Sequence, residues 1–477
     1  MKRELDRVFN PRSVAVVGDK KANDYMWLKS LSTFTGKLYS VQIDPAELPG
    51  IQELGVENYS SLLDIPQPID YVIIAVPRTI APKIVHDCIR KDVGGATLFT
   101  SGFAEANTDE GRELESIIVK MAREADFNLI GPNCMGVYNP KVGLRNDAQQ
   151  YCGEGGPVGF IAQSGTMAIS FSLVGESNGI KMSKSVSYGN GVVLDSADFL
   201  EYLAMDEETK IIGIYIEGVK DGRRLFRCLR ETTRSKPVLI WKGGEGEGGA
   251  RAVACHTASL ASSPIIWEAL IQQCGAIKVD NLDSMIDIVK GLLYIKPPGG
   301  ARVGLVAMSG GHSVVMSDAF TRVGLEVPLL CDSSYEDFDC FFNPIGGSCR
   351  NPLDISWNMP SVEHIVKILN ILSRDENIDS VVLELLLPNL VLMWEYDSSY
   401  FDNLIGALAE FKTTCPKSFL VVLTPWQVEA EAMKARVRLI EKGIPSFPSF
   451  ERGAKALKKL EEYYKLGRNQ RLYAKDV

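Results

Sequence analysis

The feature that most constrains the fold is a repeated alternation between short apolar runs and segments with helical periodicity. In the first part of the chain the apolar runs are residues 13–17, 38–43, 70–76 and 95–100, and a helix is predicted at 81–91. Apolar runs of this length predict strands that are buried on both faces. Helices between such strands imply right-handed crossovers, so the pattern predicts a parallel, Rossmann-like sheet.

The same alternation returns twice in the remaining sequence. Predicted strands at 158–162 and 302–308 are each followed by a turn of serine and glycine and then by a helical segment. Stretches rich in proline and glycine, at 131–157 and 296–300, separate the blocks. A chain of 477 residues is too long for one core. We therefore expect three α/β domains, at residues 1–130, 150–296 and 300–477.

Ligands of parallel sheets bind at the carboxyl ends of the strands, and small or polar residues mark these ends in the first block. The candidates for contacts with a cofactor are Gly18, Asp19, Lys20, Lys21, Val76, Pro77, Ser101, Gly102 and Phe103. The glycines of a dinucleotide fingerprint do not follow Gly18, but two lysines do, so a phosphorylated, nucleotide-like ligand is one interpretation. An exposed basic turn is the other.

A turn of small residues follows the predicted strand of the second block. It consists of Gln163, Ser164, Gly165 and Thr166, which open a predicted helix. The amides and the positive end of a helix N-terminus favour a phosphate or a carboxylate, although Ser164 also suits a plain N-cap. Further on, Glu217 ends another predicted strand. A carboxylate there either orients a neighbouring imidazole or is simply solvated.

Histidine is scarce in this chain, with four in total. His256 follows a stretch that holds five glycines between Gly243 and Gly249, and it precedes a predicted helix that begins near Pro264. A histidine at the end of a glycine-rich segment is suited to moving between sites or to meeting a partner; an incidental surface histidine is the alternative. His312, in the turn of the third block, is a weaker candidate because a histidine there can simply cap the helix.

Composition excludes several classes of function. The net charge is −9 and the sequence has no basic run, so nucleic acid is not an expected partner. No stretch reaches the about 18 apolar residues of a membrane span, and the N-terminus lacks the apolar segment of a secretory signal. The ten cysteines form no Cys-x-x-Cys pair. Neither a metal site nor a disulfide framework is therefore expected, and a cytoplasmic location fits.

Several short motifs, in order along the chain, together resemble a known family. They are residues 13–18, Val76 and Pro77, 101–105 (Ser-Gly-Phe-Ala-Glu), 131–134 (Gly-Pro-Asn-Cys), 163–165 (Gln-Ser-Gly), 215–218 (Tyr-Ile-Glu-Gly) and His256 with Thr257, then 309–311, 318–325, 351–354 and 443–445. With these motifs the chain is similar to the NDP-forming acyl-CoA synthetases, the superfamily of succinyl-CoA synthetase. Its third block resembles the extra ligase domain of the ADP-forming acetyl-CoA synthetases.

The resemblance implies an α/β fold in which a Rossmann-like CoA-binding domain precedes two flavodoxin-like, succinyl-CoA synthetase-like parallel-sheet domains. It also implies an α-type subunit that takes part in the reversible, ATP-dependent ligation of a small carboxylic acid to coenzyme A. In the family a histidine carries the phosphoryl group; His256 matches that histidine, and Glu217 matches the carboxylate that steadies it. Gln163, Ser164, Gly165 and Thr166 match the helix end that holds the phosphate. The strand-end candidates of the first block, together with Asn133, are expected to contact CoA.

The resemblance implies a partner as well. Family members use an ATP-grasp domain, and no nucleotide-binding pattern of that kind is found in this sequence. A separate ATP-grasp β-type subunit that binds ATP or ADP and Mg²⁺ is therefore expected, in a hetero-oligomer. Two alternatives stay open. One is a divergent CoA-binding or regulatory protein without phosphoryl transfer, and the other is a nucleotide-independent acyl or carbamoyl transferase on the same fold.

Overall fold

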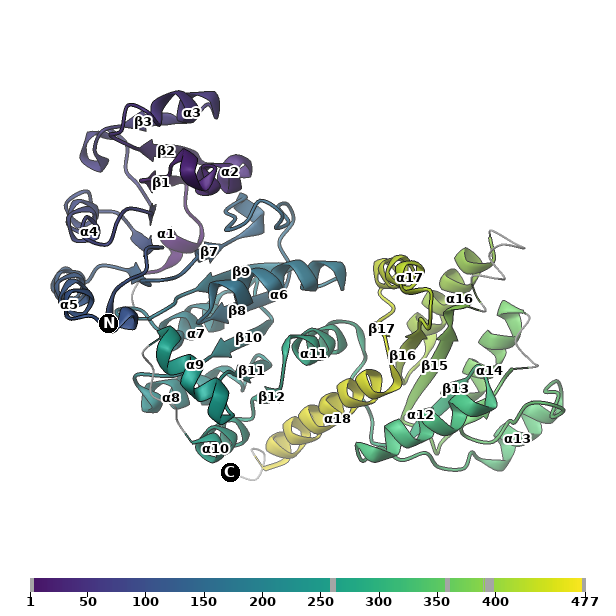
Figure 1. Cartoon of the computed structure of the whole chain (residues 1–477). Helices are drawn as coiled ribbons and strands as arrows, with labels where there is room; N and C mark the ends of the chain where they lie inside the picture. The colour runs from purple at the N-terminus through teal and green to yellow at the C-terminus, as the bar shows by residue number, and fades with distance from the viewer. Residues whose placement is uncertain (1–3, 258–262, 357–360, 389, 391–398, 474–477) are drawn as a thin grey trace. The chain divides into compact units, whose positions relative to one another are not determined.

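The computed structural model describes residues 4–257, 263–356, 361–388, 390 and 399–473. Three parallel-rich sheets, each with helices on its faces, follow one another along the chain (Figure 1). The chain forms two compact units. The first unit holds Met1–Glu176 and Ile180–Leu282, and the second holds Ser177–Gly179 and Asp283–Val477. The first two sheets belong to the first unit and the third sheet belongs to the second.

The first sheet is entirely parallel and has the strand order of a Rossmann fold. Its strands, in spatial order, are β3 (Glu57–Tyr59), β2 (Lys37–Val41), β1 (Ser13–Val17), β4 (Tyr71–Ile74), β5 (Gly95–Leu98) and β6 (Leu129–Ile130). The helices of this part are α1 (Asp6–Phe9), α2 (Met26–Ser30), α3 (Leu48–Glu53), α4 (Ala81–Arg90) and α5 (Asp109–Glu124). The order changes direction between β1 and β4, so the carboxyl ends of these two strands form the expected ligand edge.

The second sheet has five parallel strands in flavodoxin order and one antiparallel edge strand. In spatial order the strands are β12 (Ile277–Val279), β11 (Val238–Lys242), β10 (Ile211–Ile216), β8 (Val158–Ala162), β9 (Met182–Ser187) and β7 (Gly136–Tyr138). Its helices are α6 (Gly165–Ser177), α7 (Ser196–Met205), α8 (Gly222–Thr232), α9 (Glu247–Thr257) and α10 (Pro264–Cys274). The next helix, α11 (Leu282–Tyr294), belongs to the second unit from Asp283 onward. The direction of the order changes between β8 and β10.

Two segments of this part differ from the prediction. Residues 131–157, predicted as a linker, contribute β7 to the edge of the second sheet, where it pairs with β9. The glycine-rich stretch that precedes His256 becomes helical from Glu247 onward. Three alanines between residues 250 and 254 favour this helix despite the glycines at its start.

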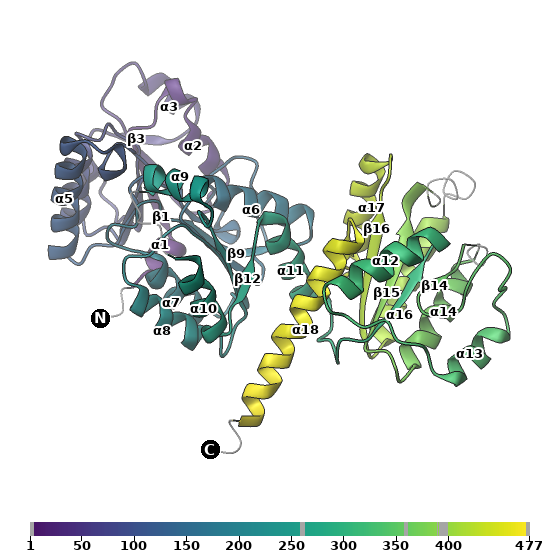
Figure 2. The ribbon, with the colours of Figure 1, turned by 60° about the horizontal axis from the view of Figure 1, so that its bottom comes forward.

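The third sheet is parallel and repeats the flavodoxin order. Its strands, in spatial order, are β14 (Leu353–Asp354), β13 (Val303–Ala307), β15 (Ser380–Leu386), β16 (Ser418–Thr424) and β17 (Ser446–Phe447). Its helices are α12 (Gly310–Arg322), α13 (Asp332–Asp339), α14 (Val362–Arg374), α16 (Tyr400–Thr414), α17 (Glu429–Glu441) and α18 (Phe450–Tyr473). Side chains of β13, β15 and β16 alternate between two cores, and α12 packs with α18 over one face (Figure 2).

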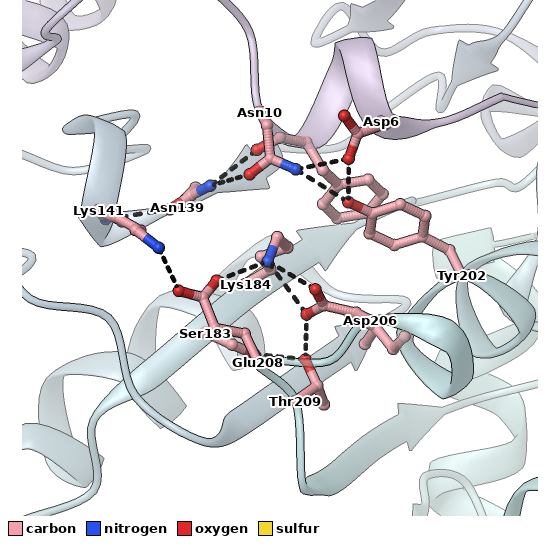
Figure 3. Close-up of polar contacts among 12 residues, drawn as sticks. Asp6, Asn10, Asn139, Lys141, Ser183, Lys184, Tyr202, Asp206, Glu208 and Thr209 are labelled. Atoms are coloured by element: carbon pink, nitrogen blue, oxygen red, sulfur yellow. Dashed lines mark hydrogen bonds and ion pairs between the residues drawn. The ribbon is translucent and has the colours of Figure 1, made fainter.

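A buried lysine stabilises the second sheet near its β7 edge. Lys184 in β9 is 2% exposed at its side chain and its Nζ contacts carboxylate oxygens of Asp206 at 3.0 Å and Glu208 at 2.9 Å (Figure 3). Lys141 also binds Glu208, at 2.7 Å. A charged group without partners is costly to bury, and these carboxylates remove that cost.

No helix of the described ranges is both long enough and apolar enough to pass through a membrane. Within the same ranges, no three His, Cys, Asp or Glu side chains lie together in a way that could hold a metal ion.

Candidate functional site

The carboxyl ends of β8 and β10 bring Gln163 and Glu217 together at the point where the strand order of the second sheet changes direction. The Gln163 side-chain oxygen Oε1 accepts hydrogen bonds from the backbone amides of Glu217, at 2.8 Å, and Gly218, at 3.0 Å. Both side chains are almost fully buried, with 4% of Gln163 and 3% of Glu217 exposed. The sequence prediction named both residues, and the structure places them in contact.

The Glu217 carboxylate is held by a tyrosine of its own strand. The Tyr215 hydroxyl donates to Glu217 Oε1 at 3.1 Å. Burial, and then the Glu217 charge, raise the pKa of Tyr215 above its usual value, so this phenol stays protonated and remains a donor. The tyrosine therefore fixes one carboxylate oxygen in place. Tyr215 belongs to the motif at 215–218, but that motif alone predicted no role for its hydroxyl.

Helix α6 begins at Gly165, directly after the Gln163 turn. A Cβ on Gly165 would lie 2.6 Å from Cγ of Met135, so any larger residue at this position would force the Met135 side chain to shift. The Ser164 hydroxyl accepts the amide of Met167 at 3.5 Å, which is the N-cap role that was the alternative for this residue. Thr166 is exposed in the first turn. The first turn of a helix leaves amides without intrahelical partners, and these suit an anion.

His256 lies in the last turn of α9, and its side chain is outside the described part of the structure. The segment that leads to it begins at the same sheet edge, because Lys242 at the end of β11 pairs with Ile216 at the end of β10. Helix α9 also lies beside the short helix η4 (Ala104–Ala106) of the first sheet. The helix that carries His256 is thus next to the loop that holds the predicted CoA contacts at 101–103.

Sequence reasoning missed a buried cation at this edge. Lys242 is 5% exposed, donates through Nζ to the carbonyl of Gly243 and lies 5.6 Å from the centre of the Trp267 ring. Burial lowers the pKa of Lys242, and the charges of Glu245 and Glu217 partly oppose that shift. A lysine at the end of an otherwise apolar strand was the signal that could have identified it.

In the first sheet, the loop after β1 is shaped by Gly18 and Asp19. Gly18 has a φ of +88°, and a Cβ there would lie 2.6 Å from Cγ1 of Val76, so β1 and β4 approach closely at this edge. The Asp19 carboxylate is buried and accepts the amides of Leu28, at 2.9 Å, and Lys20, at 3.1 Å. Its side chain therefore holds the loop rather than facing a ligand. Lys20 and Lys21 are exposed and offer positive charge.

The other predicted CoA contacts lie at the ends of β4 and β5. Ser101 is exposed, and Gly102 has a φ of +98°. The Phe103 side chain, by contrast, is fully buried in the core, so only its backbone can face a ligand. Val76 and Pro77 follow β4. The backbone amide of Asn133 donates to the carbonyl of Thr100 at 3.1 Å. These segments meet at one edge of the first sheet.

Glu105 connects this edge to the second sheet and was not among the predicted site residues. Its carboxylate accepts the amides of Gly102 at 2.7 Å and Phe103 at 3.2 Å through Oε1, while Oε2 accepts Nδ2 of Asn190 at 2.7 Å. Asn190 follows β9 and is 6% exposed. The close approach at Gly18, the exposed lysines and this fixed loop together fit a phosphorylated ligand such as CoA.

Comparisons with known proteins define the class. Residues 12–140 match the CoA binding domain family, and residues 155–292 match the succinyl-CoA ligase like flavodoxin domain family. The chain thus combines a CoA-binding module with a module of acyl-CoA ligases. It is 33% identical over 448 residues to the α subunit of the ADP-forming acetate–CoA ligase II of Pyrococcus furiosus, covering 93% of this chain and 94% of that one. This chain therefore belongs to the α-like members of the NDP-forming acyl-CoA synthetases, in the ADP-forming acyl-CoA ligase family.

Two further relatives extend the comparison. The ADP-forming acetate–CoA ligase I of Archaeoglobus fulgidus is 34% identical over 476 residues, which cover 98% of this chain but 65% of that protein. The chain thus spans about two thirds of that longer relative. Among solved structures, the dinucleotide forming acetyl-coenzyme A synthetase 1 of Ca. Korarchaeum cryptofilum, in complex with phosphate and ADP, has a TM-score of 0.83 at 27% identity and covers 98% of both chains. The predictions of fold class and family are confirmed; the domain boundaries and site residues stay predictions.

Proposed function

We propose that this chain is the α-type subunit of an ADP-forming acyl-CoA synthetase, which converts a small carboxylic acid, CoA and ATP reversibly to acyl-CoA, ADP and phosphate. The observation that carries the proposal is the buried Gln163–Glu217 contact at the start of α6, in a chain that spans nearly the whole length of an α subunit. The acid is left open within this class; acetate is the first to test, since the relatives named above act on it.

In this proposal the first sheet binds CoA. Lys20 and Lys21 supply positive charge for its phosphates, and the backbone of the loop at 101–103, fixed by Glu105, lines the same edge. CoA supplies the thiol that accepts the acyl group. The short helix that follows this loop lies beside α9, which supports transfer between a CoA-bound acyl group and the segment of His256.

In the direction of acyl-CoA cleavage, inorganic phosphate attacks the thioester carbonyl, the carbon–sulfur bond breaks and CoA leaves, which gives an acyl phosphate. Its phosphoryl group then passes to His256. The lone pair of a ring nitrogen attacks the phosphorus of an acyl phosphate, the bond from phosphorus to the acyl oxygen breaks, and the carboxylic acid leaves as its carboxylate. Amides in the first turn of α6 stabilise the phosphoryl charge without reorganisation. Glu217 accepts a hydrogen bond from the other ring nitrogen and stabilises the positive charge that develops on the imidazole.

Return of the phosphoryl group to a nucleotide requires a second protein component. We propose an ATP-grasp β-type subunit that binds ADP or ATP with Mg²⁺ and assembles with this chain in a hetero-oligomer. The near-complete match to a relative that is itself named an α subunit supports a separate chain for that component.

The test is the formation of phosphohistidine. The chain is incubated with acetyl-CoA and radiolabelled inorganic phosphate, with and without an ATP-grasp subunit, and acid-labile, base-stable label is mapped by peptide mass spectrometry. Label on the peptide of His256, lost in His256→Asn and kept in His86→Asn, is the expected result. His86 is a suitable control because it lies on α4, with its side chain 58% exposed. CoA binding without label on any histidine would contradict the proposal and favour a binding protein.

A further inference from the structure

A second histidine–carboxylate pair lies in the third sheet. Nδ1 of His312 is 2.5 Å from Oε1 of Glu384. His312 belongs to the first turn of α12, directly after β13, and Glu384 belongs to β15. These strands are neighbours, and the strand order of the sheet changes direction between them. Ligands of open α/β sheets bind at such a point.

The carboxylate of Glu384 is fully buried and its partners fix both oxygens. Oε2 accepts the amide of Met308 at 2.9 Å, and Oε1 accepts the hydroxyl of Thr424 at 2.9 Å in addition to its contact with His312. Within the described ranges, His312 is the one basic side chain at ion-pair distance from Glu384. Nδ1 of His312 faces the buried carboxylate, which needs a hydrogen-bond donor there. Nδ1 therefore carries the proton, and in the neutral ring the lone pair is on Nε2.

The ring of His312 is held in position but remains accessible. Trp426 and Phe450 contact it edge to face, with ring centres at 5.6 and 5.7 Å. The side chain of His312 is 20% exposed. No hydrogen bond to Nε2 is formed by the residues that the structure describes. An oriented imidazole with one nitrogen bound to a carboxylate and the other available is the arrangement of a nucleophile or a base.

The surroundings suit a phosphoryl group. Gly310 and Gly311 are exposed in the first turn of the 13-residue helix α12, where amides have no intrahelical partner. A Cβ at Gly311 would meet nothing within 4 Å, so the space beside Gly311 is open, whereas a Cβ at Gly310 would lie 3.0 Å from Oδ2 of Asp354. The second sheet has the same layout, with Gly165 opening α6 and Glu217 ending the adjacent strand. In the third sheet the histidine is part of the helix itself.

We propose that His312 is a second phosphoryl-accepting histidine, phosphorylated at Nε2 by a small acyl phosphate. The Nε2 lone pair attacks phosphorus, the bond from phosphorus to the acyl oxygen breaks, and its electron pair leaves with the carboxylate product. The Nδ1 proton stays in the hydrogen bond to Glu384, which balances the charge on the ring and acts as a positioning residue. The inference rests on the proposed function only for the source of the acyl phosphate in the cell.

His364 provides a matched control. It stands at the third position of α14, and its amide is capped by the Ser361 hydroxyl at 3.1 Å, just as the amide of His312 is capped by Ser309 at 3.3 Å. Its ring stacks on Phe341, with ring centres 5.8 Å apart. No carboxylate of the described residues forms an ion pair with it. It therefore has the helix position of His312 without the buried partner.

The experiment uses the full chain, without a partner subunit, and acetyl phosphate with a radioactive phosphoryl group. Acid-labile, base-stable label is mapped to peptides of the parent and of three variants: His256→Asn, His312→Asn and His364→Asn. We expect label on the His312 peptide in the parent and in His256→Asn, loss of that label in His312→Asn, and no change in His364→Asn. Mapping the parent needs no variant, so a misfolded variant does not decide the outcome.

Glu384 is tested by two substitutions. Glu384→Gln should slow labelling of His312 by about 10- to 100-fold, and Glu384→Asp should recover part of the rate. Thermal unfolding of each variant shows whether the fold is kept. Label on His256 but never on His312 would overturn the inference and leave the proposed function intact. Label on His312 but never on His256 would support the inference and remove His256 as the carrier.

Discussion

Gln163 holds the backbone of Glu217, because one side-chain oxygen of Gln163 accepts the amides of Glu217 and of the next residue, Gly218. The two residues are 54 positions apart in sequence, and they meet only because β8 and β10 are neighbours. The contact sets where the Glu217 carboxylate stands relative to the start of α6. Both the stability and the chemistry of this sheet edge are therefore expected to depend on it.

Replacing Gln163 with leucine should destabilise the protein. The variant leaves two buried amides without an acceptor, and each such group costs about 1–3 kcal/mol. We expect the free energy of unfolding to fall by about 2–4 kcal/mol, as measured by urea denaturation. Gln149→Leu, which removes an exposed glutamine, is the control and should have little effect. Equal losses in both variants would argue against a role for the Gln163 contact.

Replacing Glu217 with glutamine should affect the phosphoenzyme more than the fold. Glutamine keeps the shape and can still accept from Tyr215, but it cannot balance the charge that develops on a phosphorylated imidazole. We expect about 10-fold less phosphohistidine at His256, measured as acid-labile label after incubation with acetyl-CoA and phosphate. The melting temperature should stay close to that of the parent. Equal phosphoenzyme levels in the two proteins would remove Glu217 from the mechanism.

Strands with strong local signals were predictable from the sequence. The predicted limits of β1 (13–17) and β8 (158–162) agree with the structure residue by residue, since each is an apolar run bounded by polar, proline or glycine residues. β7 was missed because its three residues lie in a stretch rich in proline and glycine, and their strand character depends on pairing with β9. Helix α9 was expected as loop because its glycines outweighed the alanines that follow.

The candidate site was predictable only in part, because the contacts between its residues depend on which strands are neighbours. Gln163 and Glu217 carry a motif signal, but their contact depends on strand order, which is a long-range property. Glu384 gave no signal, because it lies inside an apolar run that predicted only a buried strand. Its partner His312 was the weaker candidate because a histidine in this turn can cap the helix; in the structure Ser309 is the cap and accepts the amide of His312. The pairing with a buried carboxylate became visible only once β13 and β15 were placed side by side.

Acid should weaken the contribution that Glu208 makes to the stability of the folded protein. A hydrogen bond from Lys141, together with the charge of Lys184, lowers the pKa of Glu208 despite its partial burial. Since the folded-state pKa is below the unfolded value of 4.5, the stabilisation is complete above that pH and is lost as the pH falls through the folded-state pKa. Glu208→Gln should cost about 1 kcal/mol at neutral pH, and this difference should vanish in acid.

The measurement is chemical denaturation of parent and variant at several pH values between neutral and strongly acidic. Glu207→Gln, which alters the exposed neighbouring carboxylate, is the control for a general effect of net charge. A difference between parent and Glu208→Gln that does not change with pH would contradict this account of the lysine pairs.

Alkaline conditions should reveal the cost of burying Lys290. Its side chain is 3% exposed and contacts Asp287 at 3.4 Å, and burial lowers its pKa from 10.5 to about 8 although Asp287 opposes the shift. Between these two pH values the unfolded chain holds a proton that the folded protein has released, so the stability of the parent rises with pH. Below about pH 8 the folded protein bears the full free-energy cost of burying the charged lysine. The difference between the folded and unfolded pKa values corresponds to about 3 kcal/mol.

Lys290→Met removes this titration and keeps most of the packing volume. Asp287 keeps a partner in Arg452, whose Nη2 lies 3.0 Å from it, so the substitution does not leave an unpaired buried carboxylate. We therefore expect the stability of the variant relative to the parent to be greatest near neutral pH and to decrease by about 3 kcal/mol as the pH approaches 10.5. Urea denaturation at closely spaced pH values measures this difference. Parallel profiles for the two proteins would show that Lys290 releases no proton on folding in this range.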